Sequence, residues 1–593
     1  MTDYFNSIAA SLKEAKESID RVNRRLSILR LIFFMLAAAF VIAGIIKDRN
    51  VLLFCAAFAF LAVFVFLCIV HGRSKEMAEL LMQKIHANDR YTARIKGDYS
   101  LLEDEGKEFA DNSHPYSSDL DLFGSHSIFS LYNISHSVFG RSAFADKLKG
   151  KDFGNLDKKG IISLQKTVAE LSRDPEFLLD YEAVGAAHPI DKLPEALMRL
   201  CAKENRLPKG FKLLYKTAPF LWIIPVLCVV LSAGVYVRIS VLAVILVNLI
   251  IWFLSSRHDF ADIFKAGKIS GQAAAIKARV DMLTDETKKQ IFVPGYIADD
   301  FESEVRSLIK ACNLCSLRDQ PISALILNVL IPFDLICADR LLDWSLDHGQ
   351  SFIRNVKGLG EAEALMCAAV PGLVHKESCV PEIEDEKTAY FSGTDMIHPL
   401  LQPQKAVANS VCIDSKSALI TGSNMSGKTT LIRTVGIMCV LAYTGASVPA
   451  KAVRTSIMRI MTSMRIADSL EENMSTFRAE LIRIGSIVEA SATQIPLLYL
   501  IDEVFRGTNS QDRTDGAEIL LTKLDKPYIA GFMTTHDYAL CDRIADGRLK
   551  DGAVFFHFSE RYEGDEVIFD YKLKEGMSHE SNARFLMRLV GIE

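Results

Sequence analysis

Long apolar runs constrain what this 593-residue chain can fold into more than any other feature of its sequence. Residues 51–70 are apolar without exception, and residues 31–46 carry no charge. Only the tetrapeptide K-D-R-N separates the two runs. A helix of about 20 residues spans the roughly 30 Å hydrocarbon core of a bilayer. The runs therefore predict a transmembrane helical hairpin within residues 29–72. A cleaved signal peptide is not expected, because the first run starts well inside the chain.

A second pair of apolar runs, residues 218–235 and 239–254, predicts another hairpin within residues 216–256. Basic residues flank both hairpins on the side of the long polar segments. By the positive-inside rule, the N-terminus and all the long segments then lie in the cytoplasm. We therefore expect a multi-pass protein of the cell inner membrane. The alternative is two pairs of buried core helices in a soluble protein, and Pro219 and Pro225 leave it more open for the second pair.

The N-terminal lead-in, residues 1–28, has apolar residues at alternating spacings of four and three. This heptad pattern predicts an amphipathic helix. Three partners remain open for its apolar face. The helix could pair with the helix expected over residues 75–95, pair with a second subunit, or rest on the membrane surface.

Overall composition argues against some classes of function. Hydrophobic residues make up 50% of the chain and charged residues 24%, which suits soluble domains combined with a few membrane segments. The formal net charge of −5 lacks the basic excess that a duplex-binding domain usually shows, although a local basic patch stays possible. Cys312 and Cys315 form a CxxC pair with no second pair nearby, so we expect two buried helix residues rather than a zinc site.

The clearest chemical motif occupies residues 422–429, which read G-S-N-M-S-G-K-T and match the phosphate-binding pattern G-x-x-x-x-G-K-[ST]. An apolar strand is expected before the loop and a helix over residues 431–443 after it. The glycines permit a backbone that turns successive N–H groups toward phosphate at the helix N-terminus. Lys428 would neutralise the β- and γ-phosphates of a nucleotide, and Thr429 would offer its hydroxyl to Mg²⁺. The predicted phosphate-binding residues are Gly422, Ser423, Asn424, Met425, Ser426, Gly427, Lys428, Thr429 and Thr430.

Two further apolar runs, residues 497–501 and 529–533, are expected to be parallel strands beside the loop. The first is followed by Asp502 and Glu503. Asp502 could bind Mg²⁺, and Glu503 could orient and deprotonate the attacking water. The second run leads to His536, which could sense the γ-phosphate through Glu503 or a water molecule. The alternatives are a solvated acidic strand end and a structural histidine.

These motifs resemble those of the MutS family of DNA mismatch-repair ATPases. Residues 421–430, T-G-S-N-M-S-G-K-T-T, are similar to the family loop T-G-P-N-M-G-G-K-S-T. Residues 502–508, D-E-V-F-R-G-T, resemble its D-E-x-x-R-G-T, and residues 475–480, S-T-F-R-A-E, resemble its S-T-F-x-x-E. The dipeptide Thr535-His536 matches its T-H switch. The likeness runs from residue 397 to the end, and a weaker one covers short stretches between residues 114 and 141.

The resemblance implies an α/β P-loop NTPase domain of the ABC/MutS-like type over residues 376–593. It also implies a mostly α-helical core and lever region over residues 73–215 and 257–375, into which the second hairpin is inserted. In such proteins two ATPase domains pack head to tail and bind Mg·ATP. Ser475 would then reach the γ-phosphate bound to the partner subunit, which implies a homodimer.

The departures from the family affect the expected function. No stretch before Asp111 resembles a mismatch-recognition domain, and the second hairpin lies near the position of the family's DNA clamp. We therefore expect a membrane-anchored ATPase that drives a conformational switch, with DNA as a candidate substrate that the charge balance does not support. The first alternative is a membrane-tethered DNA clamp in repair or recombination. The second is an ABC-type transporter, which the short interval between Lys428 and Asp502 and the lack of an L-S-G-G-Q signature disfavour.

Overall fold

The computed structural model describes residues 2–47, 50–155, 157–193, 195–202, 206–231, 234–256, 260–384, 387–423, 425–464, 476–505, 509–550, 552–563 and 566–577. The chain divides into two compact units. The first unit comprises Met1–Ile134, Ser142–Leu179 and Ala364–Glu593. The second comprises Ser135–Arg141 and Asp180–Glu363.

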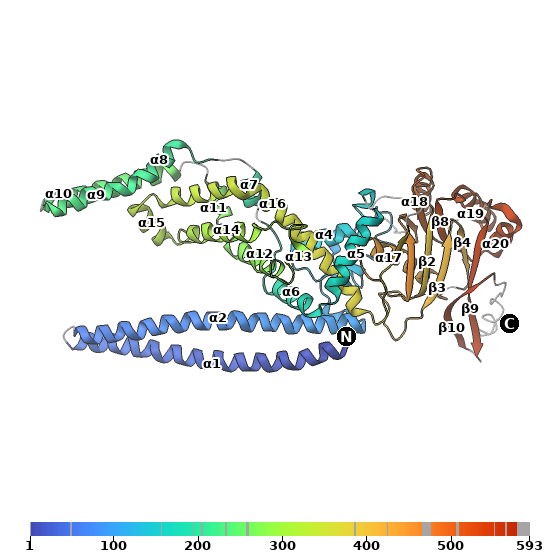
Figure 1. Ribbon diagram of the computed structural model, residues 1–593, viewed down its shortest axis with the longest axis horizontal. Helices are drawn as coiled ribbons and strands as arrows, with labels where there is room; N and C mark the ends of the chain where they lie inside the picture. Colours follow the sequence, from blue (N-terminus) through green and yellow to red (C-terminus); the bar gives the residue numbers. More distant parts are fainter. Residues whose placement is uncertain are drawn as a thin grey trace. The chain divides into compact units, whose positions relative to one another are not determined.

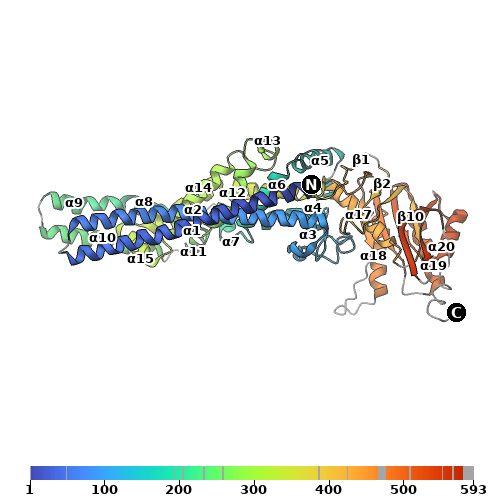
Figure 2. The same cartoon turned by 90° about the horizontal axis from the view of Figure 1, so that it is seen from below.

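The first unit begins with a long helical hairpin of α1 (Thr2–Ile46) and α2 (Val51–Lys96), which pack side by side along their length (Figures 1 and 2). The lead-in and the first apolar run form one continuous helix. Phe5 near the start of α1 stacks on Tyr91 near the end of α2, with ring centroids 5.0 Å apart. The heptad pattern left three partners open for the N-terminal lead-in. In the structure, the lead-in packs against the part of α2 that follows the apolar hairpin.

Short helices follow the hairpin and lead into the second unit. They are η1 (Tyr99–Leu101), η2 (Lys107–Phe109), α3 (Ile128–Tyr132), α4 (Val138–Leu148), η3 (Phe153–Asn155), α5 (Lys158–Ser172) and α6 (Pro175–Ala187). The regular secondary structure described in the second unit is helical, apart from an isolated bridge between Ser137 and Ile190. Its remaining helices are α7 (Glu195–Ala202), α8 (Lys209–Thr217), η4 (Ala218–Trp222), α9 (Ile223–Val230), α10 (Gly234–Ser256), α11 (Ala261–Ala266), α12 (Ser270–Leu283), α13 (Lys289–Phe292), α14 (Phe301–Ser316), α15 (Pro321–Leu330) and α16 (Phe333–Val374).

Four helical stretches among the described residues are long and apolar enough to cross a membrane, judged by length and composition alone. They are Asp3–Ile46, Val51–Lys96, Lys209–Val230 and Gly234–Ser256. Three of the four predicted apolar runs lie within them, but the run predicted over residues 218–235 is divided, because the third stretch ends at Val230 and Val235 belongs to the fourth. Cys312 and Cys315 lie buried on α14, as expected for small residues on the inner face of a helix.

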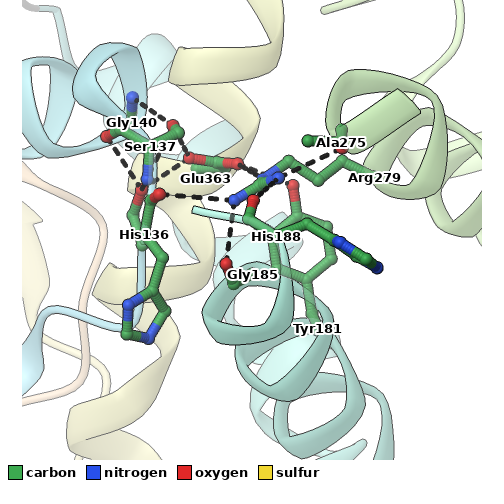
Figure 3. A network of polar contacts seen from close by, with 10 residues as sticks. His136, Ser137, Gly140, Tyr181, Gly185, His188, Ala275, Arg279 and Glu363 are labelled. Atoms are coloured by element: carbon green, nitrogen blue, oxygen red, sulfur yellow. Dashed lines mark hydrogen bonds and ion pairs between the residues drawn. The ribbon is translucent and has the colours of Figure 1, made fainter. Parts of the chain in front are cut away.

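A buried ion pair forms the polar core of the second unit (Figure 3). Arg279 of α12 and Glu363 of α16 have side chains 0% and 1% exposed, and Arg279 Nε lies 3.1 Å from Glu363 Oε1. The carboxylate also accepts hydrogen bonds from the hydroxyls of Ser135, Ser137 and Tyr181. The guanidinium donates to backbone carbonyls of Ala275, Gly185, His188 and His136. Both carboxylate oxygens and all three guanidinium nitrogens thus have partners, which is what makes a buried ion pair tolerable.

Two sheets form the C-terminal part of the first unit. The smaller sheet has the order β1-β5-β2-β3, and its strands are β1 (Glu382–Glu384), β2 (Tyr390–Met396), β3 (Asn409–Asp414) and β5 (Ala452–Ser456). The larger sheet has the order β10-β9-β4-β8-β7-β6, and its strands are β4 (Ser417–Thr421), β6 (Arg459–Ser463), β7 (Leu497–Asp502), β8 (Ile529–Thr534), β9 (Ala553–Glu563) and β10 (Glu566–Glu575). All pairings in the larger sheet are parallel except that of β9 with β10.

Helices cover the larger sheet and bury its central strands (Figure 1). They are α17 (Lys428–Tyr443), α18 (Thr476–Ala490), α19 (Ser510–Leu524), α20 (Tyr538–Arg543) and the π-helical turn η5 (Ile544–Arg548). Every residue of β7 and β8 is buried, and Tyr499, Ile529 and Leu521 belong to the core beside them. Because β4, β7 and β8 are parallel neighbours, their carboxyl ends meet at one edge of the sheet, where open α/β sheets bind ligands.

Candidate functional site

The loop between β4 and α17 is shaped by three residues with positive φ. Gly422 has φ 144°, Met425 has φ 69° and Gly427 has φ 108°. A Cβ atom at Gly422 would lie 3.0 Å from both the Phe558 carbonyl oxygen and Ser426 Oγ, so a side chain here would require these neighbours to move and would be strained by the positive φ. The helix begins at Lys428, earlier than the sequence predicted, and its N-terminus is directed at the loop.

Lys428 folds back over its own loop. The side chain is 5% exposed, and Nζ donates hydrogen bonds of 2.8 Å to the carbonyl oxygens of Gly422 and Ser423. The same Nζ lies 3.2 Å from His536 Nε2. A cation held by neutral carbonyls can exchange them for phosphate oxygens, which bind an ammonium group more strongly.

Asp502 at the end of β7 is held by two hydroxyls. Thr429 Oγ1 donates to Oδ2 over 3.0 Å, and Thr534 Oγ1 donates to Oδ1 over 2.6 Å. The first hydroxyl comes from α17 and the second from the end of β8. A carboxylate and a hydroxyl oxygen in contact are ligands of the kind that Mg²⁺ takes in nucleotide sites. The residues present therefore fit the metal that the motif implies.

Glu503 takes a strained backbone conformation directly after Asp502. Its φ of 54° places a non-glycine residue in the left-handed region, where strain is usually found at functional positions. The backbone N–H is held by the Thr534 carbonyl at 3.2 Å. The carboxylate Oε1 lies 2.7 Å from His536 Nε2. Lys428, His536 and Glu503 thus form a row of side chains from three different parts of the sheet edge.

Glu480 supports the turn that follows this strand end. It lies on α18, is 2% exposed, and its Oε1 accepts a 2.5 Å hydrogen bond from the backbone N–H of Phe505. Phe505 has a φ of 58°, so the acceptor holds a second left-handed residue in place. The S-T-F-x-x-E motif is thereby joined to the D-E motif.

A cavity of about 870 Å³ opens beside these groups. This volume lies within the range of roughly 300–1,000 Å³ that small-molecule sites occupy. One side of it is formed by the loop and by Asp502 and Glu503. The other side consists of residues that the sequence analysis did not identify, namely Met396, His398, Leu401, Lys405, Val407, Asn409 and Tyr571.

Asn409 holds the far wall of the cavity together. Its Nδ2 donates to the Tyr571 carbonyl at 2.9 Å, and its Oδ1 accepts from the Leu573 N–H at 2.8 Å. These bonds tie β3 to an irregularity in β10, where the register shifts between Phe569 and Leu573. A side-chain amide that replaces strand pairing leaves no periodic pattern in the sequence, so this contact could not be predicted.

His398 adds a neutral ring to the same wall. Burial, with Arg433 nearby as the second cause, lowers the pKa of His398 to about 4. The imidazole is therefore uncharged at neutral pH. The only signal for it in the sequence is its place near the start of the stretch with family likeness.

The structure brings together most of the predicted site residues. Ser423 donates through its hydroxyl to Glu560. The hydroxyl of Ser426 is buried and has no hydrogen-bond partner among the described residues, which leaves it available to a ligand. Thr430 lines the cavity beside Lys428. Asn424 and Ser475 lie outside the described residues, and the roles assigned to all of these side chains stay predictions.

Comparison with known proteins agrees with the architecture of this site. The family model "MutS domain V" matches residues 418–592. The DNA mismatch repair protein MutS of Persephonella marina is 33% identical over 177 residues, which cover 30% of this chain and 20% of that protein. MutS of Pelotomaculum thermopropionicum is 30% identical over 266 residues, which cover 43% of this chain and 30% of that protein. MSH3 of Phaeosphaeria nodorum is 29% identical over 268 residues, which cover 43% and 23%.

The matched regions thus span less than a third of each of these relatives. The residues that match the family model contain the loop, the strand ends and the histidine described above. Residues 418–592 match a MutS domain V, and through this region the chain resembles proteins of the MutS family.

Proposed function

We propose that this protein is a membrane-anchored, Mg²⁺-dependent ATPase that uses its nucleotide cycle to drive a conformational switch between two copies. One observation carries the proposal. Lys428, Asp502, Glu503 and His536 converge at the ends of β4, β7 and β8 beside a cavity of about 870 Å³. This combination of a phosphate loop, paired carboxylates and a cavity suits a nucleoside triphosphate.

The triphosphate would lie over the loop. Lys428 Nζ would leave the carbonyls of Gly422 and Ser423 for phosphate oxygens, and the unpaired hydroxyl of Ser426 would donate to one of them. Thr429 and Asp502 would hold Mg²⁺, which neutralises phosphate charge when it is bound. The nucleobase would face the wall that contains Met396, His398, Val407 and Tyr571.

Hydrolysis would depend on Glu503. Its carboxylate would orient a water molecule and take a proton from it as the water oxygen attacks the γ-phosphorus and the bond to the ADP oxygen breaks. His536, 2.7 Å from Glu503 and 3.2 Å from Lys428, would link the carboxylate to the phosphate-binding amine. The strained φ of Glu503 fixes the direction of this base.

Anchoring is supported by the exposed apolar surface of the two hairpins. In each of the four candidate spans, at most 17% of the most apolar window is buried. Leu52, Phe58 and Leu231 are each more than 70% exposed. Apolar surface of this extent in water would carry a large free-energy cost, which acyl chains would remove. The protein would then lie in the cell inner membrane with its ATPase domain in the cytoplasm.

Dimer formation follows from the family resemblance and rests on Ser475. This residue would contact the γ-phosphate bound by a partner subunit. Ser475→Ala is expected to reduce turnover while ATP binding is retained. ATP should also increase cross-linking between two copies, and full wild-type turnover in the variant would contradict the role of the partner.

The test of the ATPase proposal uses the full chain in lipid nanodiscs. Mg²⁺-dependent release of phosphate is expected, and Glu503→Gln should bind ATP while its turnover falls by about 10²–10³-fold. Glu489→Gln, an exposed carboxylate on α18, is the matched control and should keep wild-type turnover. The proposal fails if the folded wild-type protein does not retain Mg·ATP.

A DNA clamp is the second candidate, and the similarity to DNA mismatch repair proteins favours it. A protein that neutralises several phosphates of duplex DNA loses affinity steeply as salt rises. Filter binding at low and moderate salt therefore tests this candidate. Phosphate release measured with and without DNA shows whether DNA affects the cycle.

A further inference from the structure

Helix α15 exposes a large apolar face for its length. Its sequence, P-I-S-A-L-I-L-N-V-L, contains no charged residue. Ile322, Leu325, Ile326 and Leu330 are 75%, 47%, 53% and 44% exposed. Leu325, Ile326 and Leu330 lie three, four and eight residues after Ile322, which places all four on one side of the helix. The helix ends abruptly and meets α16 at an angle of 94°.

The end of α15 is capped by side chains from the second hairpin. Asn248 is fully buried on α10, and its Nδ2 donates to the carbonyl oxygens of Val329 at 2.9 Å and Leu330 at 3.0 Å. Trp222 Nε1 donates to the same Leu330 oxygen at 2.7 Å. A helix that ends in water leaves its last carbonyls to the solvent, whereas in lipid each of them needs a partner within the protein.

The polar groups at the break between α15 and α16 also have hydrogen-bond partners within the protein. Asp334 is 7% exposed and accepts hydrogen bonds from Trp252 Nε1 at 3.1 Å, Arg318 Nε at 3.0 Å and Asn328 Nδ2 at 3.0 Å. The Arg318 guanidinium also lies 3.6 Å from the ring centroid of Phe264. The buried Asp334 carboxylate is thus satisfied by protein partners, as expected next to hydrocarbon, while the Arg318 side chain is 29% exposed.

The indole rings of two tryptophans indicate the depth at which the α15–α16 break would lie in a membrane. Trp222 and Trp252 belong to the second hairpin, and both donate to the α15–α16 break. Tryptophan favours the boundary between water and lipid, where its ring lies in the apolar layer and its N–H finds an acceptor. If the second hairpin spans the membrane, α15 lies at this boundary, because it packs against α10. Leu246 and Ile250 of α10 are also exposed.

We propose that α15 is a membrane-embedded helix that binds phospholipid acyl chains through the face containing Ile322 and Ile326. Its ten residues extend about 15 Å, half of the roughly 30 Å hydrocarbon thickness. The helix α15 is therefore too short to cross the bilayer. The chain enters α15 from α14 and leaves it into α16 on the same side of the bilayer. This inference rests on the proposed anchoring and adds a fifth lipid-contacting helix to the four candidate spans.

Photocross-linking in liposomes tests the inference on the full chain. Benzoylphenylalanine replaces one residue at a time, and the phospholipid has a clickable tag in its acyl chain. The positions are Ile326 on α15, Leu246 on α10 as the anchoring control, and Ile519 on α19 as the matched control. Ile519 is an isoleucine with 58% exposure, close to the 53% of Ile326, and lies in the ATPase domain. Retained ATP binding confirms that each variant is folded, and Ile322 replaces Ile326 if that variant does not fold.

The expected result is lipid adduct at Ile326 and Leu246, several-fold above that at Ile519. Adduct at Leu246 but not at Ile326 overturns the inference and leaves the anchoring intact. A protein–protein adduct at Ile326 also overturns it, because a second copy would then cover the face. If neither Leu246 nor Ile326 labels lipid, both the anchoring and the embedded helix are wrong. Equal lipid labelling at Ile519 would likewise overturn it, because labelling would not then depend on embedding.

Discussion

Two buried arrangements of charged side chains, one in each unit, differ in how their charges are satisfied. In the second unit, Arg279 and Glu363 have protein partners at every polar atom of their charged groups. At the edge of the larger sheet, Lys428 is held by carbonyls of its own loop, and the Ser426 hydroxyl is unpaired among the described residues. The second arrangement also borders a cavity. Burial of charge alone therefore does not identify a ligand site, but replaceable partners beside a cavity do.

Backbone conformation shows the same contrast. Arg279 and Glu363 lie inside long regular helices. At the proposed nucleotide site, Met425, Glu503 and Phe505 all have positive φ without being glycine. Strain of this kind costs about 1–3 kcal/mol for each residue and persists where the surroundings enforce it. The helical unit is thus built for stability and the sheet edge for binding.

The largest expected effect is on the stability of the second unit. Arg279→Leu leaves the Glu363 carboxylate buried without its cation, which should lower the free energy of unfolding by about 3–5 kcal/mol. Hydrogen exchange of the α12 amides measures this change. The matched control is Arg306→Leu on α14, whose 57%-exposed side chain forms a surface ion pair, and it should cost less than about 1 kcal/mol.

A double variant separates charge from packing in this network. Arg279→Met combined with Glu363→Gln leaves no unpaired charge, so it should be less destabilised than Arg279→Leu. If the double variant loses as much stability as the two single variants together, Arg279 and Glu363 are not energetically coupled, and the ion pair does not stabilise the fold as a pair. ATP affinity of the folded proteins should stay unchanged throughout.

Next in size is the loss of catalysis without loss of stability at the nucleotide site. Lys428→Met should lower ATP turnover by about 10²–10³-fold, because it removes the cation that neutralises phosphate charge. Phosphate release measures turnover, and the thermal unfolding midpoint should not fall. The exposed Lys451→Met is the control and should keep full activity. If Lys428→Met were destabilised but still active, Lys428 would have a structural role like that of Arg279. The proposed difference between the two regions would then be wrong.

The sequence predicted those parts of the molecule that depend on local patterns. The loop of residues 422–429, the buried strands before Asp502 and Thr534, and the two hairpins all follow from motif spacing or from run length. The cavity wall did not, because His398, Asn409 and Tyr571 come from separate strands and loops of two sheets. Arg279 and Glu363 are far apart in the chain and belong to no motif. Contacts that only tertiary packing creates leave no trace in a single sequence.

A smaller effect is expected for a residue that holds a metal ligand in place than for a residue that takes part in the reaction. Thr534→Val removes the hydroxyl that donates to Asp502 Oδ1 and also receives the Glu503 N–H. Loss of a group that orients a metal ligand typically weakens metal binding by 10–100-fold. The Mg²⁺ concentration for half-maximal turnover should therefore rise by about tenfold. Thr522→Val, on the exposed side of α19, should leave it unchanged. An unaltered Mg²⁺ requirement in Thr534→Val would show that Asp502 needs no help from β8.

The smallest expected effect is that of Ser426→Ala. It is also the sharpest test of the difference between the two regions, because the variant should be stabilised without ATP and should bind ATP more weakly. Ser426 Oγ is buried without a partner among the described residues, so Ser426→Ala should raise stability in the absence of ATP by about 1 kcal/mol. With ATP present, the same change removes a donor to phosphate and should weaken binding by about tenfold. Thermal unfolding with and without Mg·ATP measures both effects in one experiment. Had Ser426 been satisfied within the protein, as the hydroxyls around Glu363 are, Ser426→Ala would lower stability in both conditions. That outcome would make the loop a structural network like the one in the second unit.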